Sequence, residues 1–474
     1  MQIATETERK YDVPADFTLP ALSGSGSAAT HELDATYFDT EDLRLARHRR
    51  TLRRRTGGTD AGWHLKTPGD GTSRTKHRLP LGRRSGNQVP AELRSEVRAI
   101  IRDRELRPVA RLRTERVETP LCDADGRTLA LIAQDRVTAE TDGTRQEWQE
   151  VEVELVDGGP ELLDAVDREL RRAGATPAGG PSKLARALGD RLPAPPTGKS
   201  KISPVLRYAR AQRDAIQAYD PGVRHGDPEA VHKMRVATRR LRSTLRTFKR
   251  SFPTDRAGFL SGELKWLAGQ LGEVRDGQVL ERKLLATVEQ EGAEFAQIAD
   301  RIREHLDAKV ENGRRALAQD LDGDRYLRLL DAIDDLVAAD DRGEPHPLKR
   351  VRRALDKADG LLDEATLTGA DEPLHEARKA YKRARYAVEV FVPSAGKPAE
   401  KLADRLTDLQ DVLGAHRDSV VAREVLYDLG HNDREAFRYG ILYARQHQVG
   451  RDTMGDLPRV IQPLRDRKLR RWFD

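Results

Sequence analysis

Charged side chains alternate along several short segments in the first part of the chain. Successive side chains of a β-strand point to opposite faces, so residues two apart share a face. By this rule Glu6, Glu8 and Lys10 lie on one face of a strand. The other charged faces are Arg53 with Arg55, His64 with Lys66, Arg74 with Lys76 and Arg78, Arg111 with Arg113, and Glu150 with Glu152 and Glu154. A solvated face explains any one of these strands, but it explains their recurrence less well.

These charged faces would line a single cavity if the strands closed into a barrel. Like charges held close together are costly unless a multiply charged ligand and a metal neutralise them. Arginine and lysine match phosphate oxygens, and clustered carboxylates match Mg²⁺ or Mn²⁺. The pattern therefore favours a polyanion such as a triphosphate, bound together with a divalent cation.

A second set of charged residues recurs at helical spacing. His232, Arg235, Arg239, Arg242 and Arg246 fall within an arc of roughly 80° on one helix. Such a face is commonly just a solvated surface, but like charges one turn apart slightly destabilise a helix. A matching row follows at His375, Arg378, Lys382 and Arg385. Because the row is repeated, we expect it to contact an anion; a helix-packing role for the two histidines stays open.

The elements that must position these residues divide the chain in two. Alternating segments and turn residues predict an α+β domain of mainly antiparallel strands over residues 1–190, with helices at 91–103 and 160–173. Prolines predict a linker at 191–204. Residues 205–474 have helical periodicity and predict an all-α domain. The predicted strands are 2–11, 51–55, 62–67, 74–81, 109–118, 128–137 and 146–156.

The helical part contains an internal repeat. The segment VHKMRVATRRLR (231–242) aligns with LHEARKAYKRAR (374–385), and LGEVRD (271–276) aligns with LGAHRD (413–418). The two offsets, 143 and 142 residues, indicate that almost the whole intervening block is duplicated. The repeat predicts two similar subdomains, at about 205–345 and 346–474.

Composition limits the classes of protein to be considered. The chain has 474 residues, of which 37% are hydrophobic and 34% charged, with a net charge of +6. The single cysteine, Cys122, excludes an internal disulfide and a cysteine-rich zinc site. No segment has about 18 consecutive apolar residues, and the first residues lack a secretory pattern. We therefore expect a soluble, cytoplasmic, multidomain protein.

The first part of the chain resembles the CYTH superfamily of triphosphate tunnel metalloenzymes. Its ETERK segment (6–10) resembles the ExExK signature of that family. The companions of this segment follow in the expected order as LRRR (52–55), WHLKTP (63–68), AQDRV (133–137), EVEVEL (150–155) and PSKL (181–184). The resemblance covers about residues 1–190 and implies an eight-stranded antiparallel tunnel that hydrolyses or cyclises triphosphates with Mg²⁺ or Mn²⁺.

The same resemblance implies the residues of the site. Metal binding is implied for Glu6, Glu8, Asp135, Glu150, Glu152 and Glu154, with Glu152 and Glu154 preferred. Phosphate binding is implied for Lys10, Arg53, Arg55, Lys66, Arg74, Arg111, Arg113 and Lys183. No residue is identified as the general base. Many relatives have an acid where this chain has Lys76, His77 and Arg78, which leaves the geometry of a second metal and the rate open.

The duplicated helices resemble the CHAD domain over about residues 200–474. That family consists of two four-helix subdomains around a basic groove that binds polyphosphate. The implied contacts are His232, Arg235, Arg239, Arg242, His375, Arg378, Lys382 and Arg385. Arg275, Asp276, Arg417 and Asp418 are weaker candidates because an Arg–Asp pair at a helix turn is often structural. Lys233 is left out because its counterpart is Glu376.

The two resemblances predict an enzyme that hydrolyses tripolyphosphate or a related triphosphate and binds polyphosphate through its helical part. The alternative is a polyphosphate-binding or targeting protein with a weakly active or inactive tunnel. Nucleic-acid binding is disfavoured because aromatic residues for base stacking are sparse and no recognised motif is present. Adenylate cyclase and thiamine triphosphatase activities stay open, as does association with polyphosphate granules.

Overall fold

The computed structural model describes residues 1–69, 73–82, 86, 88–192, 202–339 and 341–473. The chain divides into two compact units, Met1–Ser200 and Lys201–Asp474. This division falls within the segment 191–204 that was predicted to be a linker, and residues 193–201 lie outside the described residues.

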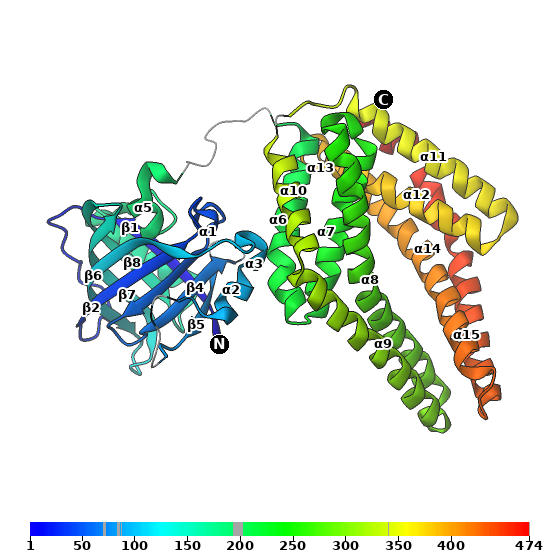
Figure 1. Ribbon diagram of the computed structural model, residues 1–474, viewed down its shortest axis with the longest axis horizontal. Helices are drawn as coiled ribbons and strands as arrows, with labels where there is room; N and C mark the ends of the chain where they lie inside the picture. Colours follow the sequence, from blue (N-terminus) through cyan, green and yellow to red (C-terminus); the bar gives the residue numbers. More distant parts are fainter. Residues whose placement is uncertain (70–72, 83–85, 87, 193–201, 340, 474) are drawn as a thin grey trace. The chain divides into compact units, whose positions relative to one another are not determined.

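The first unit is a closed antiparallel barrel of eight strands (Figure 1). Neighbouring strands follow the order β5-β4-β3-β2-β6-β7-β8-β1, and β1 pairs with β5 to close the ring. A two-residue strand, β9 (Thr176–Pro177), adds to β1. The predicted eight-stranded tunnel is thus confirmed. The strands are β1 (Gln2–Asp12), β2 (Ala29–Asp39), β3 (Thr51–Thr56), β4 (Gly62–Pro68), β5 (Ser73–Leu79), β6 (Arg107–Cys122), β7 (Thr128–Thr141) and β8 (Thr144–Leu155).

Much of the apolar core of this unit lies outside the barrel wall. Val151 and Val153 of β8 pack beneath α4 (Pro160–Arg172). Trp63 and Leu65 of β4 pack beneath α2 (Ala91–Glu96) and α3 (Arg98–Ile101), and α1 (Arg44–Arg47) adds Leu45 to the same cluster. Because these strands bury their apolar face against outer helices, their inner face is free to carry charge.

A third apolar cluster closes one end of the barrel. The short helix α5 (Lys183–Leu188) packs Leu184 and Leu188 against Val137 of β7 and Trp148 of β8. Ser182 caps the start of α5, where its hydroxyl accepts a hydrogen bond of 3.1 Å from the backbone N–H of Ala185. The helix begins at Lys183, so this side chain enters the barrel from the closed end.

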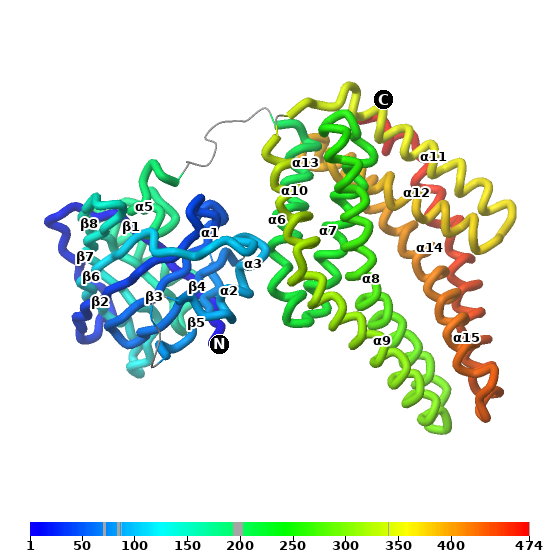
Figure 2. The backbone as a smooth tube through the Cα atoms, viewed as in Figure 1, coloured from blue at the N-terminus to red at the C-terminus, as the bar shows by residue number. Residues whose placement is uncertain are grey.

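The second unit is all helical, as predicted, and its helices form two successive halves along the chain (Figure 2). The apolar residues of α8, α9, α14 and α15 share one core cluster. The first half comprises α6 (Pro204–Arg224), α7 (Pro228–Thr247), α8 (Thr254–Glu291), α9 (Ala296–Asp322) and α10 (Asp324–Ala338). The second comprises α11 (Pro347–Thr368), α12 (Asp371–Glu389), the short α13 (Val392–Ala395), α14 (Lys397–Gly430), α15 (Ala436–Gly455) and α16 (Leu457–Leu464).

The repeated motifs occupy equivalent places in the two halves. The two basic rows lie on α7 and α12, and the two LG-x-x-RD segments lie within α8 and α14. A local signal explains where α7 starts, because Pro228 fits the first helical turn and the Asp227 carboxylate accepts from the backbone N–H of Glu229 at 2.9 Å. Among the described helices, none combines the length and apolarity that a membrane crossing requires.

Candidate functional site

The lumen of the barrel is lined by charged side chains from many of its strands. The registers place Glu8 of β1 opposite Glu154 of β8, and Lys10 opposite Glu152. On the other side of β1, Glu6 lies opposite Arg74 of β5. The alternation seen in the sequence therefore brings acids and bases from distant segments together inside one closed wall.

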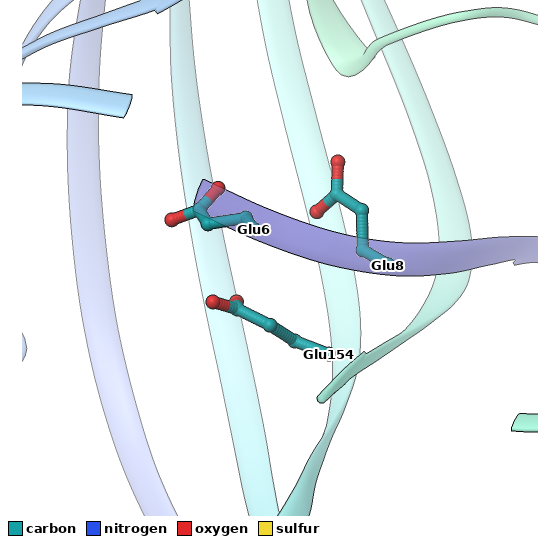
Figure 3. Close-up of side chains that lie close together, drawn as sticks. All are labelled: Glu6, Glu8 and Glu154. Carbon is teal, nitrogen blue, oxygen red and sulfur yellow. The ribbon is translucent and has the colours of Figure 1, made fainter. Parts of the chain in front are cut away.

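Three carboxylates converge at one place in the lumen (Figure 3). Glu6, Glu8 and Glu154 each offer an oxygen, and these oxygens lie within 4.8 Å of one another. Burial, then the nearby carboxylate of Glu6, raises the pKa of Glu154. Of the six predicted metal ligands, these three form the one group within the described residues that has the spacing of a metal site.

Lysines surround this carboxylate group. Lys66 Nζ lies 2.6 Å from Oε2 of Glu6 and 3.7 Å from Oε2 of Glu8. Lys76 Nζ lies 2.9 Å from Oε1 of Glu6, and Lys10 Nζ lies 3.2 Å from Oε1 of Glu8. Burial alone would raise the pKa of Glu6, but Lys66 and Lys76 outweigh it and lower that pKa to about 2. Glu6 is therefore held ionised.

The other three predicted metal ligands surround Lys183 instead. Its Nζ atom lies 2.9 Å from Asp135, 2.6 Å from Glu150 and 2.8 Å from Glu152. Burial would lower the pKa of Lys183, but these carboxylates raise it. Arg116 adds bonds of 2.8 and 2.7 Å to Asp135 and of 2.9 Å to Glu152. In this structure the three acids are thus neutralised by the chain itself.

A basic group adjoins these carboxylates. Arg53 and Arg55 of β3 line the same small cavity as Arg116 and Lys183. Burial, then the neighbouring Arg53, lowers the pKa of Arg55 to about 9. Arg55 pairs with Asp60, which lies in the turn between β3 and β4. The guanidinium groups are crowded together, which a bound anion would relieve.

The structure corrects the prediction for two arginines of β6. Arg111 and Arg113 lie on the outer face of the barrel, where their side chains are 49% and 51% exposed. Arg111 pairs with Asp34 at 2.5 Å and Arg113 with Glu140 at 3.2 Å. The expectation that they face the tunnel is wrong, because β6 turns its other face, with Leu112, Thr114 and Arg116, toward the cavity.

Sequence reasoning missed Arg116 and Asp60. Arg116 lies directly opposite Asp135 in the register of β6 and β7, so the pairing with the AQDRV segment was the available signal. Asp60 lies in a turn, where an acid is ordinarily part of the turn itself. It pairs with Lys76 at 3.0 Å as well as with Arg55, so it supplies negative charge beside the lysine that departs from the family pattern.

In the helical unit, the two predicted basic rows come together where α7 and α12 are in contact. Burial lowers the pKa of Lys382 to about 7, helped by Arg378, Arg239 and Arg235. Burial, together with Arg239 and Arg235, lowers the pKa of Arg378, although Asp418 raises it. Four cations from both repeats therefore crowd one half-buried surface, which we call the cationic cluster: Arg235, Arg239, Arg378 and Lys382.

A glycine of the neighbouring helix lies beside one arginine of the cationic cluster in each repeat. A Cβ atom at Gly272 of α8 would lie 3.2 Å from Nη2 of Arg235. At the equivalent Gly414 of α14, the corresponding distance to Nη2 of Arg378 is 3.8 Å. Each arginine therefore lies across the glycine of the neighbouring helix, but only at Gly272 would a side chain crowd the guanidinium, because 3.8 Å at Gly414 is ordinary contact.

Comparisons with known proteins agree with this geometry. The CYTH domain model matches residues 4–188, and the CHAD domain model matches residues 207–427. An uncharacterized protein of Mycobacterium tuberculosis is 37% identical over 511 aligned residues, which cover 99% of this chain and 98% of the relative. The chain belongs to the CYTH–CHAD family.

Two solved structures are also similar. PptA from Streptomyces chartreusis is 19% identical, with a TM-score of 0.49, and the match covers 55% of this chain and 98% of that one. The CHAD domain from Ricinus communis is 26% identical, with a TM-score of 0.41, and the match covers 55% of this chain and 88% of that one.

The CYTH domain fits the divalent cation on which tunnel metalloenzymes depend. Carboxylate oxygens are the ligands that Mg²⁺ and Mn²⁺ prefer. Glu6, Glu8 and Glu154 supply three of them from two neighbouring strands, at a spacing that one ion can span.

The remaining predicted contacts of the CHAD domain lie around the cationic cluster. Arg242 donates to the backbone oxygen of Ser261 at 3.0 Å, and Arg385 donates to Thr407 at 3.0 Å. Burial, then Arg275, lowers the pKa of His232. Burial, then Lys379 and Arg417, lowers the pKa of His375. Asp276 makes two bonds to Arg235, of 2.6 and 2.8 Å, whereas Asp418 pairs with Lys283.

Proposed function

We propose that the CYTH domain hydrolyses inorganic tripolyphosphate or a related triphosphate with Mg²⁺ or Mn²⁺, and that the CHAD domain binds linear polyphosphate. The first part rests on one observation above all: a closed barrel holds three convergent carboxylates beside a wall of lysines and arginines. In a chain of phosphates with one divalent ion, the phosphates would neutralise the lysines and arginines, and the ion would neutralise the carboxylates. Localisation to the cytoplasm stays a prediction.

The residues of the lumen suggest a division of labour during hydrolysis. Glu6, Glu8 and Glu154 would hold the divalent ion, which supplies charge neutralisation at phosphate oxygens. Lys10, Lys66 and Arg74 lie next to those carboxylates and would bind the phosphate groups nearest to the metal. Arg53 and Arg55 would stabilise the negative charge that spreads over the transferred phosphoryl group.

The barrel wall and α5 also limit where water can enter. The cluster around Leu184 and Leu188 closes one end, and Lys183 fills the space among three carboxylates there. A substrate would therefore enter from the opposite end. Lys183 would contact the phosphate group of the substrate that lies nearest to α5, if its ammonium group bound a phosphate oxygen in place of one carboxylate.

For the CHAD domain, the crowding of the cationic cluster is the supporting observation. Burial and then three neighbouring guanidinium groups lower the pKa of Lys382 to about 7. A polyanion laid across the cluster would remove that repulsion. Linear polyphosphate has dense charge and no bases, so it fits a surface on which stacking aromatics are sparse.

The test of the catalytic part is release of phosphate from tripolyphosphate by the full chain with Mg²⁺ or Mn²⁺. Glu8→Gln should reduce the release to the level measured in EDTA, because it replaces one of the three carboxylates with an uncharged amide. Glu115→Gln, on the outer face of β6, is the matched control. Absence of metal-dependent release by the unmodified protein, over a panel of triphosphates, would refute the proposal.

The second candidate is a polyphosphate-binding or targeting protein with a weak tunnel. One observation favours it: Lys66 and Lys76 both lie within 3 Å of Glu6, where they compete with a metal ion. That alternative predicts tight binding of long-chain polyphosphate with turnover near background. Competition by duplex DNA as effective as that by polyphosphate would point instead to nucleic-acid binding.

A further inference from the structure

His64 of β4 is a buried lumen residue to which the proposed function has so far given no role. Its side chain is 0% exposed. Trp63 and Leu65 on either side belong to the outer apolar cluster, so alternation turns His64 inward. The registers place it between Arg53 of β3 and Arg78 of β5.

The hydrogen bonds of its neighbours determine which nitrogen carries the proton. Arg53 Nε donates to Nδ1 of His64 at 3.4 Å, and Nη1 of the same guanidinium donates to the Tyr37 hydroxyl at 3.1 Å. Arginine has no acceptor, so Nδ1 must be the acceptor and the neutral ring is protonated at Nε2. Burial, then Arg53 and Arg55, lowers the pKa of His64 to about 2 and keeps the ring neutral.

The Nε2–H group has no hydrogen-bond partner among the described residues. The nearest carboxylate oxygen, Oδ2 of Asp60, lies 3.8 Å away, and that atom already accepts from Lys76 at 3.0 Å. A buried donor without an acceptor is costly, and native proteins rarely leave one in that state. The missing acceptor is most simply a ligand atom.

We propose that His64 is a substrate-binding residue of the tunnel and that its Nε2–H donates to a phosphate oxygen of the bound triphosphate, beside Arg53 and Arg55. The proposal rests on the function proposed above. It assigns His64 a task that another lysine or arginine could not do as well. A neutral donor adds a hydrogen bond without adding charge to a wall that already holds Arg53, Arg55 and Lys76 close to it.

Two substitutions distinguish a hydrogen-bonding role of His64 from a space-filling role. In His64→Gln, the amide oxygen can accept from Arg53 while the amide N–H₂ reaches the position of Nε2. His64→Leu fills the same space without a donor. Binding of inorganic tripolyphosphate to the full chain is measured by calorimetry in EDTA, so that turnover is absent, and phosphate release is then measured with Mg²⁺ or Mn²⁺.

We expect His64→Leu to weaken binding by about 10-fold or more and His64→Gln by less than about threefold, because a hydrogen bond to a charged acceptor is stronger than one between neutral groups. Equal binding by the unmodified protein and His64→Leu would overturn the inference alone. Binding and release missing from the unmodified protein would refute the proposed function. If His64→Leu does not fold, His64→Asn replaces it, since its amide is too short to reach the Nε2 position; unchanged binding would then overturn the inference.

Discussion

Lys183 Nζ lies 2.9 Å from the Oδ2 atom of Asp135, so the helix that closes the barrel is tied to a carboxylate in the barrel wall. Both side chains are buried, at 8% and 0% exposure. Glu150 and Glu152 share the same ammonium group. The lysine thus fixes α5 in place and also neutralises acids that would otherwise repel one another.

Removing this lysine should destabilise the CYTH domain in a pH-dependent way. Lys183→Met leaves Glu150 buried without its cation and removes one of the cations that pair with Asp135 and Glu152. Breaking a buried pair typically costs about 3–5 kcal/mol. Despite burial, Lys183 helps to lower the pKa values of Asp135 and Glu152, so the loss should be full at pH 8 and smaller at pH 3, where both carboxyl groups of the variant take up protons. Urea unfolding at the two pH values measures it.

Arg186→Met is the matched control for that experiment. Arg186 belongs to the same helix but makes a half-exposed ion pair with Asp12. Exposed pairs contribute about 0–1 kcal/mol, so this variant should stay within that range at both pH values. Equal losses for the two variants would contradict a special role for Lys183.

The ionised state of Glu6 should make the CYTH domain sensitive to acid. Its pKa is lowered from 4.5 to about 2, so it contributes stability above pH 4.5 and loses that contribution as the pH falls toward 2. The contribution near neutral pH is about 3 kcal/mol. Glu6→Gln should therefore lower the free energy of unfolding at pH 7 and converge with the unmodified protein near pH 2.

That comparison is made by urea unfolding in EDTA, so that metal binding to Glu6 does not contribute. Glu115→Gln, on the outer face of the barrel, controls for the loss of one carboxylate. A constant difference between Glu6→Gln and the unmodified protein from pH 7 to pH 2 would show that Lys66 and Lys76 do not depress this pKa.

The sequence predicted seven of the eight barrel strands, and the missing one has a physical explanation. The inner face of β2 carries no charges, because Leu33, Ala35 and Tyr37 are the residues that it turns toward the cavity. The predicted helix at 91–103 is instead two short helices, α2 and α3, separated at Val97. Charge alternation identified the strands whose charged residues form the candidate site, but it did not identify β2, whose inner face is apolar.

The error at Arg111 and Arg113 has a different cause. Both faces of β6 carry polar side chains, so alternation alone could not decide which of them points inward. The partners that decide the question, Asp34 on β2 and Glu140 on β7, belong to neighbouring strands. Such cross-strand pairing depends on the strand order, which composition and spacing do not contain.

Polyphosphate binding by the CHAD domain should weaken as the pH rises. The pKa of Lys382 is lowered to about 7, whereas a bound polyanion favours the protonated form. Above pH 7 binding must take up a proton, so affinity should fall by up to about tenfold per pH unit. Calorimetric titration of long-chain polyphosphate at pH 6 and pH 8.5 measures the change.

Lys382→Arg should remove this dependence, because arginine stays charged throughout the range. Lys379→Ala serves as the control, since Lys379 is exposed on the same helix and pairs with Glu376 at 2.7 Å. A steep pH dependence that persists in Lys382→Arg would assign the titration to another group.

The two repeated glycines allow a matched test of the cationic cluster. Gly272→Ala would place its Cβ atom 3.2 Å from Nη2 of Arg235, which is tighter than ordinary contact, so the guanidinium must move and its bonds to Asp276 must adjust. Gly414→Ala leaves 3.8 Å to Arg378 and should be accommodated. We expect Gly272→Ala to change polyphosphate affinity several-fold and Gly414→Ala to leave it unchanged.

Within a helix, alanine is favoured over glycine by about 1 kcal/mol, so Gly414→Ala should also raise the melting temperature. If both variants bound polyphosphate as tightly as the unmodified protein, Arg235 would not take part in binding.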